Sequence, residues 1–151
     1  MQRLEWSALL ETGVAEMDAS HRLLLQAIHA TIDADDGSLP GRITALLAAL
    51  AADFAEEEAL MDHLHYPTDH EHRAAHSRVL AALQHALPVA WADPRGARGL
   101  LERLPRWFVG HLSAMDLPLA VAIERARRPY SAPPEASLRL QLARLLQEQS
   151  I

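Results

Sequence analysis

The sequence predicts an all-α protein, an antiparallel up-down four-helix bundle with an N-terminal arm and a short C-terminal extra helix. Half of its 151 residues are apolar and only 5% are aromatic, and the abundance of Leu and Ala favours helices over sheets. Apolar residues recur at helical spacing in four long segments joined by short, turn-rich loops, a pattern typical of antiparallel bundles. We expect one domain over 1–128 and, over 129–151, a linker followed by an amphipathic helix.

The chain before the first helix reads as an irregular arm over residues 1–18, in which Trp6 is expected to anchor onto the body of the protein. N-cap chemistry in Asp18-Ala-Ser20 precedes a run of apolar residues with helical period, so the first helix is expected to begin there. The turn-forming cluster Asp35-Asp-Gly-Ser38 is expected to end it.

The second and third helices are predicted from proline positions and apolar spacing. Pro40 suits the first turn of a helix that runs to about Leu64. The third helix is predicted over about 69–87, ending near Pro88, and the segment 92–96 is expected to be a loop.

A fourth helix is predicted over about 97–127, with kinks rather than breaks at Pro105 and Pro118, because proline removes a backbone donor. Prolines also mark the linker over 129–134. Residues 135–148 then read as a short amphipathic fifth helix.

Composition excludes several classes of protein. A net charge of −6 with scattered arginines makes nucleic-acid binding a poor fit. The absence of cysteine excludes disulfides, thiolate metal sites and cysteine nucleophiles. No window of 18 uncharged apolar residues predicts a membrane span, and the N-terminus lacks the apolar stretch of a secretory signal, so we expect a cytoplasmic protein.

Side chains of metal-binding types recur at one-face spacing on the second and third predicted helices, and one more lies on the first. His72 and His76 are four residues apart on the third helix, and Asp53 and Glu57 have the same spacing on the second. His21 lies one turn before the apolar run of the first helix. Each helix alone also fits a solvated histidine pair or an acidic surface, so it is their coincidence that predicts a metal site.

On the fourth helix His111 and Asp116 are five residues apart, which is a rotation of about 140° on an ideal α-helix. A π-bulge between them would bring both to one face, and such bulges are frequent at functional sites. Imidazole and carboxylate ligands without sulfur suit iron, manganese or zinc. The seven nitrogen and oxygen groups on four helices are enough for two metal ions.

These residues lie in motifs that resemble the hemerythrin family, especially its bacterial single-domain members. The motifs are Trp6, Gly13-Val-Ala-Glu-Met-Asp18-Ala-Ser-His21, Phe54-Ala-Glu-Glu57-Glu58-Ala-Leu-Met61, Tyr66-Pro67 before His72-Arg-Ala-Ala-His76, and Trp107 before His111 and Asp116. The resemblance covers about residues 6–125 and leaves out the tail from Pro129.

The resemblance implies two iron ions joined by an oxo or hydroxo bridge, with dioxygen as the ligand. It implies that one iron is held by His72, His76 and His111. Glu57 and Asp116 are implied as carboxylates that bridge the two metals.

The second iron, which binds dioxygen in hemerythrins, would take His21 and the residue at position 53. The family has histidine there, in a His-Phe-x-x-Glu-Glu pattern, whereas this chain has Asp53. Aspartate is shorter and anionic, so three arrangements stay open: direct ligation, ligation through water, and an open position. A further alternative is that Asp53 points to solvent and the second metal is missing. His63, His65 and His70 are expected to be a solvated surface cluster rather than replacement ligands.

Three functions follow from this sequence. The first is reversible dioxygen binding for carriage, storage or sensing. The second is a di-iron oxidase, peroxidase or nitric-oxide-handling enzyme, which the extra carboxylate favours. The third is a degenerate bundle with an interaction role, in which the Leu138, Leu142 and Leu145 face binds a partner protein or a second copy. The simpler expectation for that face is docking onto the bundle itself.

Overall fold

The computed structural model describes residues 3–128, 139, 141–142 and 144–145. Within these residues all regular structure is helical. The elements are η1 (Ala8–Leu10), α1 (Ala15–Ile32), α2 (Leu39–Leu64), α3 (Asp69–Ala92), α4 (Pro94–Leu101), α5 (Leu104–His111), η2 (Leu112–Asp116) and α6 (Leu117–Arg127).

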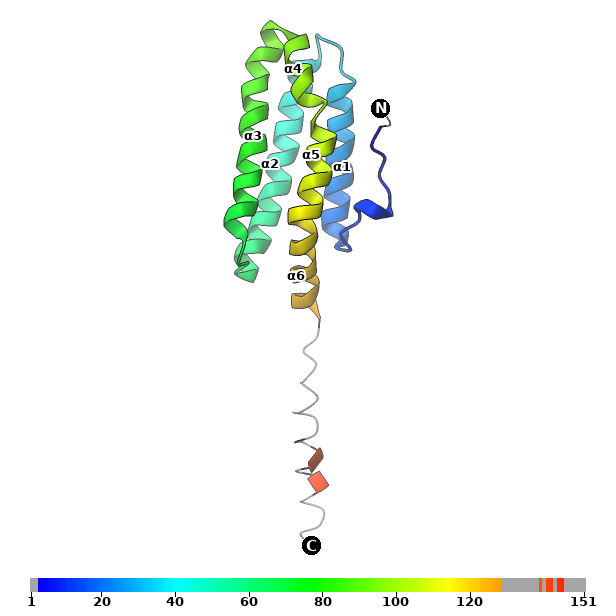
Figure 1. Cartoon of the computed structure of the whole chain (residues 1–151), viewed down its shortest axis with the longest axis vertical. Coiled ribbons are helices and arrows are strands. Elements are labelled where there is room, and N and C mark those ends of the chain that lie inside the picture. Colours follow the sequence, from blue (N-terminus) through cyan, green and yellow to red (C-terminus); the bar gives the residue numbers. More distant parts are fainter. Residues whose placement is uncertain (1–2, 129–138, 140, 143, 146–151) are drawn as a thin grey trace.

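The predicted four-helix bundle is confirmed. Helices α1, α2 and α3 stand side by side with a fourth column, in which α5, η2 and α6 follow one another end to end (Figure 1). Helix α1 packs against α2, α2 against α3, and the fourth column closes the bundle through contacts of α5 with α1 and of α6 with α2. The short α4 joins α3 to this column at one end of the molecule.

The N-terminal arm runs along the outside of α1 (Figure 1). As expected, Trp6 packs against the core, and the Arg22 guanidinium lies 5.1 Å from its ring centroid. The expected start of α1 at residues 18–20 is wrong, because the helix begins at Ala15. The Asp18 carboxylate instead accepts hydrogen bonds from the backbone N and Oγ1 of Thr12, at 2.7 and 2.8 Å. Asp18 therefore closes the preceding loop rather than capping the helix.

The predicted end of the third helix near Pro88 is also wrong. Helix α3 continues through Pro88 to Ala92, and α4 begins at Pro94, so little of the expected loop over 92–96 exists. Proline removes one hydrogen bond near the end of a 24-residue helix. Burial of Ala86 and Ala90 on the same helix continues past it, which explains why the helix is not terminated there.

The fourth predicted helix is divided where its prolines fall. Pro105 and Pro118 occupy the first turns of α5 and α6, where a helix needs no backbone donor. At Pro105 the helix is interrupted rather than kinked, because Glu102 and Arg103 form a turn between α4 and α5. The bulge expected between residues 111 and 116 is confirmed as the five-residue π-helix η2.

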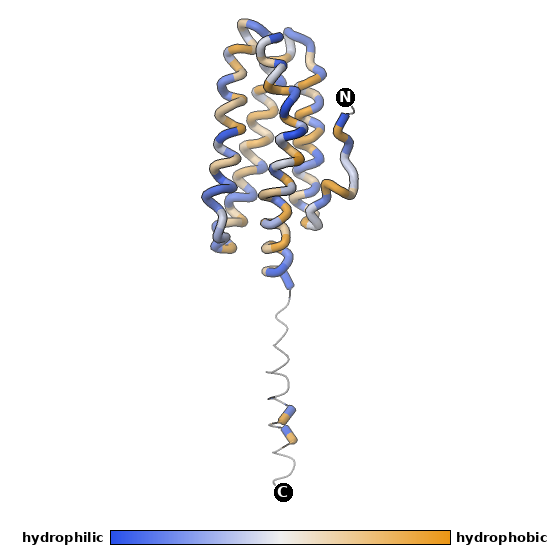
Figure 2. The backbone as a smooth tube through the Cα atoms, in the orientation of Figure 1, coloured by the Kyte–Doolittle hydropathy of each residue, from blue (hydrophilic) through white to orange (hydrophobic). Residues whose placement is uncertain are grey.

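Two apolar clusters fill the bundle, and a polar layer lies between them. On α2, Phe54 belongs to the larger cluster and Met61 to the smaller one, with the buried Glu57 between them. Hydrophobic residues recur along all four columns at helical intervals (Figure 2). The packing on both sides therefore holds the polar layer at a fixed height in the bundle.

No helix among the described residues is long and apolar enough to cross a membrane. The expected linker over 129–134 and most of the expected helix over 135–148 lie outside the described residues, as does Leu138. Leu142 and Leu145 are described, lie in helical conformation and are each 56% exposed. These two leucines are therefore exposed rather than buried.

Candidate metal centre

The seven side chains expected to bind metal all point into the polar layer. Each is buried, although they come from four separate helical columns: His21, Asp53, Glu57, His72, His76, His111 and Asp116. They form two groups of possible ligands, within each of which the ligand atoms lie within 4.8 Å of one another. The first group is Glu57, His72, His76, His111 and Asp116, and the second is His21, Asp53 and Glu57.

The Glu57 carboxylate has one oxygen toward each group. Its Oε2 lies 3.1 Å from His76 Nε2 and 3.4 Å from His72 Nε2. Its Oε1 lies 3.2 Å from His21 Nε2 on the opposite side. Glu57 therefore spans the gap between the histidines of α3 and the histidine of α1.

Asp116 spans the same gap from the fourth column. Its Oδ1 lies 3.1 Å from Nε2 of both His72 and His111, and its Oδ2 lies 3.5 Å from His21 Nε2. The π-helix η2 makes this possible, because its wider turn brings the side chain five residues after His111 onto the same face.

Asp53 points inward, so the alternative that it faces solvent is wrong. Its side chain is 5% exposed, and its Oδ2 lies 3.9 Å from His21 Nε2. Its Oδ1 accepts a hydrogen bond of 2.5 Å from Ser20 Oγ. Burial and the neighbouring Glu57 charge raise the pKa of the Asp53 carboxyl to about 6, against the lowering effect of the Ser20 hydrogen bond.

The imidazole of His76 is held in one orientation from outside the polar layer. Its Nδ1 lies 3.0 Å from Oε1 of Glu58, whose Oε2 accepts a hydrogen bond from Arg73 at 2.9 Å. Phe54 stacks on the same ring, with centroids 3.7 Å apart and planes within 6°. A proton on Nδ1 leaves the lone pair of Nε2 facing Glu57 and the interior.

The charges in the layer perturb one another strongly. Burial disfavours the charged form of His72, but hydrogen bonding to Asp116 and the charge of Glu57 outweigh it and raise the pKa of His72 to about 9. Burial also opposes ionisation of Glu57, yet the surrounding histidines hold its pKa well below the usual range. The polar layer thus favours ionised carboxylates paired with positively charged groups.

Several buried atoms of the layer have no hydrogen-bond partner within residues 3–128. They include Glu57 Oε2 and His76 Nε2, which lie 3.1 Å apart without the alignment of a hydrogen bond. Unsatisfied buried polar atoms are costly. A cation between the two would satisfy both, and nitrogen and oxygen donors without sulfur suit iron, manganese or zinc. The residues present therefore fit a metal pair.

The remaining histidine cluster has no part in the layer. His63, His65 and His70 are exposed around the turn from α2 to α3 and belong to neither ligand group, as expected. Sequence reasoning missed Ser20 and Glu58, which contact the ligand candidates from outside. Both lie in the motifs that resemble the family, Glu58 as the second residue of the Glu-Glu pair, but the sequence does not indicate that they contact His76 and Asp53.

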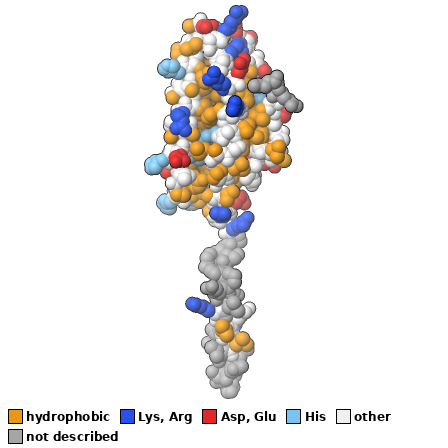
Figure 3. Space-filling model, viewed as in Figure 1, with side chains coloured by type: hydrophobic (Ala, Val, Ile, Leu, Met, Phe, Trp, Pro, Cys, Tyr) orange, Lys and Arg blue, Asp and Glu red, His pale blue; other side chains and the backbone are white. Residues whose placement is uncertain are grey.

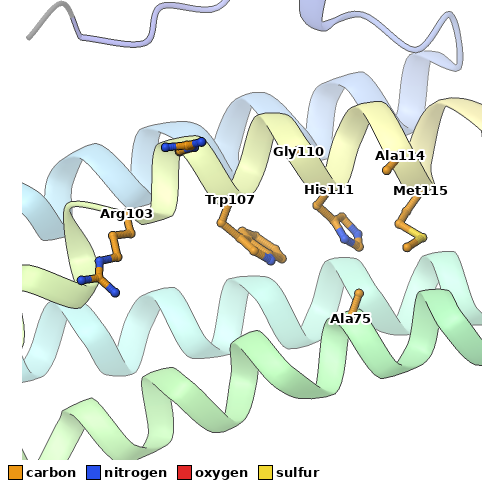
Figure 4. A pocket seen from close by; sticks show the side chains of 8 residues that line it. Ala75, Arg103, Trp107, Gly110, His111, Ala114 and Met115 are labelled. Carbon is orange, nitrogen blue, oxygen red and sulfur yellow. The ribbon is translucent and has the colours of Figure 1, made fainter.

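A surface pocket reaches the edge of the centre between α3 and the fourth column. It has a volume of about 580 Å³ and is lined by Ala75, Arg103, Arg106, Trp107, Gly110, His111, Ala114 and Met115. Figure 4 shows Trp107, His111 and Met115 directed from the fourth column toward α3. On this face hydrophobic side chains with arginines among them cover the fourth column (Figure 3). His111, at 8% exposed, is the ligand candidate nearest this opening.

The chain is similar in sequence to a known bacterial protein. No family model matches the chain. A bacteriohemerythrin from Ralstonia nicotianae is 33% identical over 117 residues, which are 77% of this chain and 85% of that protein.

Proposed function

This chain belongs to the bacteriohemerythrin family, and from that premise we propose that its buried centre holds two iron ions and binds dioxygen reversibly. The proposed unit is the bundle over residues 1–128. The observation that carries the proposal is the orientation of Glu57 and Asp116. Glu57 directs one carboxylate oxygen toward the α3 histidines, and Asp116 directs one toward His72 of α3 and His111 of α5. Each directs its other oxygen toward His21.

The proposed ligands divide into two sets with two shared members. The first metal takes His72, His76 and His111. The second takes His21 and Asp53. Glu57 and Asp116 are shared by both metals. Iron held there supplies the redox chemistry by which dioxygen is bound.

The protein's own contribution is orientation and exclusion of water. Phe54 stacks on His76, Trp107 stacks on His111 with centroids 5.1 Å apart, and Phe108 meets the His21 ring edge to face at 5.8 Å. These rings fix the imidazoles and surround them with apolar groups. A dry wall of this kind keeps water and protons away from a bound ligand, which favours reversible binding over irreversible oxidation.

A second candidate function is a di-iron oxidase or peroxidase, and Asp53 is the observation that favours it. A third carboxylate in place of a neutral imidazole adds negative charge at the second metal. Negative charge stabilises ferric over ferrous iron and so favours electron transfer out of the centre. The two functions use the same metal ligands. They differ in whether the state that forms in air returns to the starting state when oxygen is removed.

Visible absorption of the full chain separates them. The protein is loaded with ferrous iron without oxygen, exposed to air, and then returned to an oxygen-free atmosphere. We expect two irons per chain and a charge-transfer band that appears in air and disappears on deoxygenation. A band that persists, together with catalytic consumption of peroxide, would instead establish the oxidase.

The matched controls are two histidine variants. His72→Ala removes a proposed ligand and is expected to lower iron content and abolish the reversible band. His63→Ala changes an exposed histidine and should leave both unchanged. Iron content well below two per chain in the wild-type protein would contradict the proposed function.

A further inference from the structure

Ser20 on α1 contacts Asp53 on α2, the residue that replaces the histidine of the family pattern. It is half-buried and directly precedes His21, and its Oγ donates a hydrogen bond of 2.5 Å to Asp53 Oδ1 on α2. Within residues 3–128 no other hydrogen bond reaches the Asp53 carboxylate. The contact joins residues 33 positions apart, so it belongs to the tertiary structure of the centre and not to local capping.

The hydrogen bond gives the two oxygens of Asp53 different roles. Oδ1 is engaged by Ser20, whereas Oδ2 lies 3.9 Å from His21 Nε2 and 5% of the side chain is exposed. The terminal torsion of an aspartate is intrinsically broad. A free carboxylate would therefore rotate, and the Ser20 hydroxyl selects the rotation that turns Oδ2 toward the second ligand group.

The chain already contains a parallel arrangement on its other side. Glu58 contacts His76 Nδ1 at 3.0 Å from outside the layer, which leaves Nε2 of that histidine facing inward. Outer contacts of this kind commonly change metal affinity 10–100-fold when they are removed. Ser20 holds the same relation to Asp53 that Glu58 holds to His76.

We infer that Ser20 is a positioning residue that fixes the Asp53 carboxylate so that Oδ2 is the one oxygen that Asp53 offers to the second metal. A serine–aspartate pair thus occupies the place that one histidine fills in the family pattern. This inference rests on the proposed two-metal function. It concerns how one ligand is held and adds no step to the chemistry.

Metal titration of the metal-free full chain tests the inference without reference to activity. Ferrous iron is titrated anaerobically by calorimetry, and cobalt(II) is titrated by visible absorption, whose bands report the geometry of each site. We expect two ions per chain for the wild type. Ser20→Ala should lower the affinity for one of the two ions by about 10–100-fold and change only the cobalt bands of that site. Ser20→Thr retains the hydroxyl and should restore both.

Glu58→Ala is the matched control for the other site, because it should lower the affinity for the ion whose binding Ser20→Ala leaves unchanged. Thermal unfolding of each metal-free variant shows whether the Ser20 hydrogen bond serves only to join α1 and α2. Wild-type affinity at both sites in Ser20→Ala would overturn the inference while leaving the proposed function intact. Equal weakening of both sites, or a loss that Ser20→Thr fails to restore, would also overturn it. Fewer than two ions in the wild type would overturn the proposed function itself.

Discussion

At the scale of single residues, position 53 sets the charge of the centre. Asp53→His replaces a buried carboxylate by a neutral imidazole, which should stabilise ferrous iron and slow irreversible oxidation in air. We expect the reversible air-induced absorption band to last several-fold longer in this variant. Its decay is timed by visible absorption at fixed pH and temperature.

The matched control for position 53 is Glu56→His, which makes a comparable exchange on the exposed side of α2. It should decay at the wild-type rate. An unchanged or shorter lifetime in Asp53→His would show that the charge at this position does not control oxidation.

His72 makes the stability of the metal-free bundle depend on pH. Its folded-state pKa of about 9 lies above the ordinary value of 6.5, so it stabilises the fold fully below pH 6.5 and loses this effect as pH rises through 9. A shift of this size corresponds to about 3 kcal/mol. The free energy of unfolding of metal-free protein, measured by urea titration, should therefore fall between pH 6.5 and 9.

Two histidine variants isolate this effect. His72→Gln should flatten the pH dependence, although a part remains because the pKa of His21 is also raised by Glu57 and Asp116 against the effect of burial. His63→Gln, at an exposed position, should retain the wild-type slope. If the free energy of unfolding of the wild-type protein did not change with pH over this range, the raised pKa of His72 would be contradicted.

At the scale of helices, the four long columns were predictable, whereas the short η1, the separation of α4 from α5 and several helix ends were not. The π-helix η2 was predictable because His111 and Asp116 needed a common face and an α-helix would have separated them. The start of α1 was not, because the Asp18 carboxylate suits a helix cap as well as the loop contact with Thr12 that it makes. Ser20 was missed for a similar reason, since its partner lies 33 residues away.

Pro88 provides a test of how packing overrides local propensity. It lies inside α3, where it removes a backbone hydrogen bond, so Pro88→Ala should raise the free energy of unfolding by about 1–3 kcal/mol. Pro105→Ala is the control, because Pro105 occupies a first helical turn where no donor is lost. Denaturant titration that gave both variants the same gain would contradict this account of α3.

At the scale of the whole molecule, the polar layer is the place where all four columns meet. Its ligand candidates extend from His21 to Asp116, and the contacts of Glu57 alone join α2 to α1 and α3. Three buried carboxylates in one layer repel one another, and several ring atoms there lack partners within residues 3–128. These groups lower the stability of the metal-free bundle, and bound cations would offset that loss.

Removal of iron should therefore loosen the entire bundle rather than one helix. At free iron 100-fold above the dissociation constant each site adds about 2.7 kcal/mol, and two sites should raise Tm by roughly 10–20 °C for a chain of this size. Calorimetry before and after chelation measures the difference, which should shrink in His111→Ala because one ligand of the first metal is gone. Equal Tm values with and without two bound irons would contradict this account, because packing alone would then offset the free-energy cost of the buried polar layer. A single cooperative transition in both states is expected, because every column contributes to the same layer.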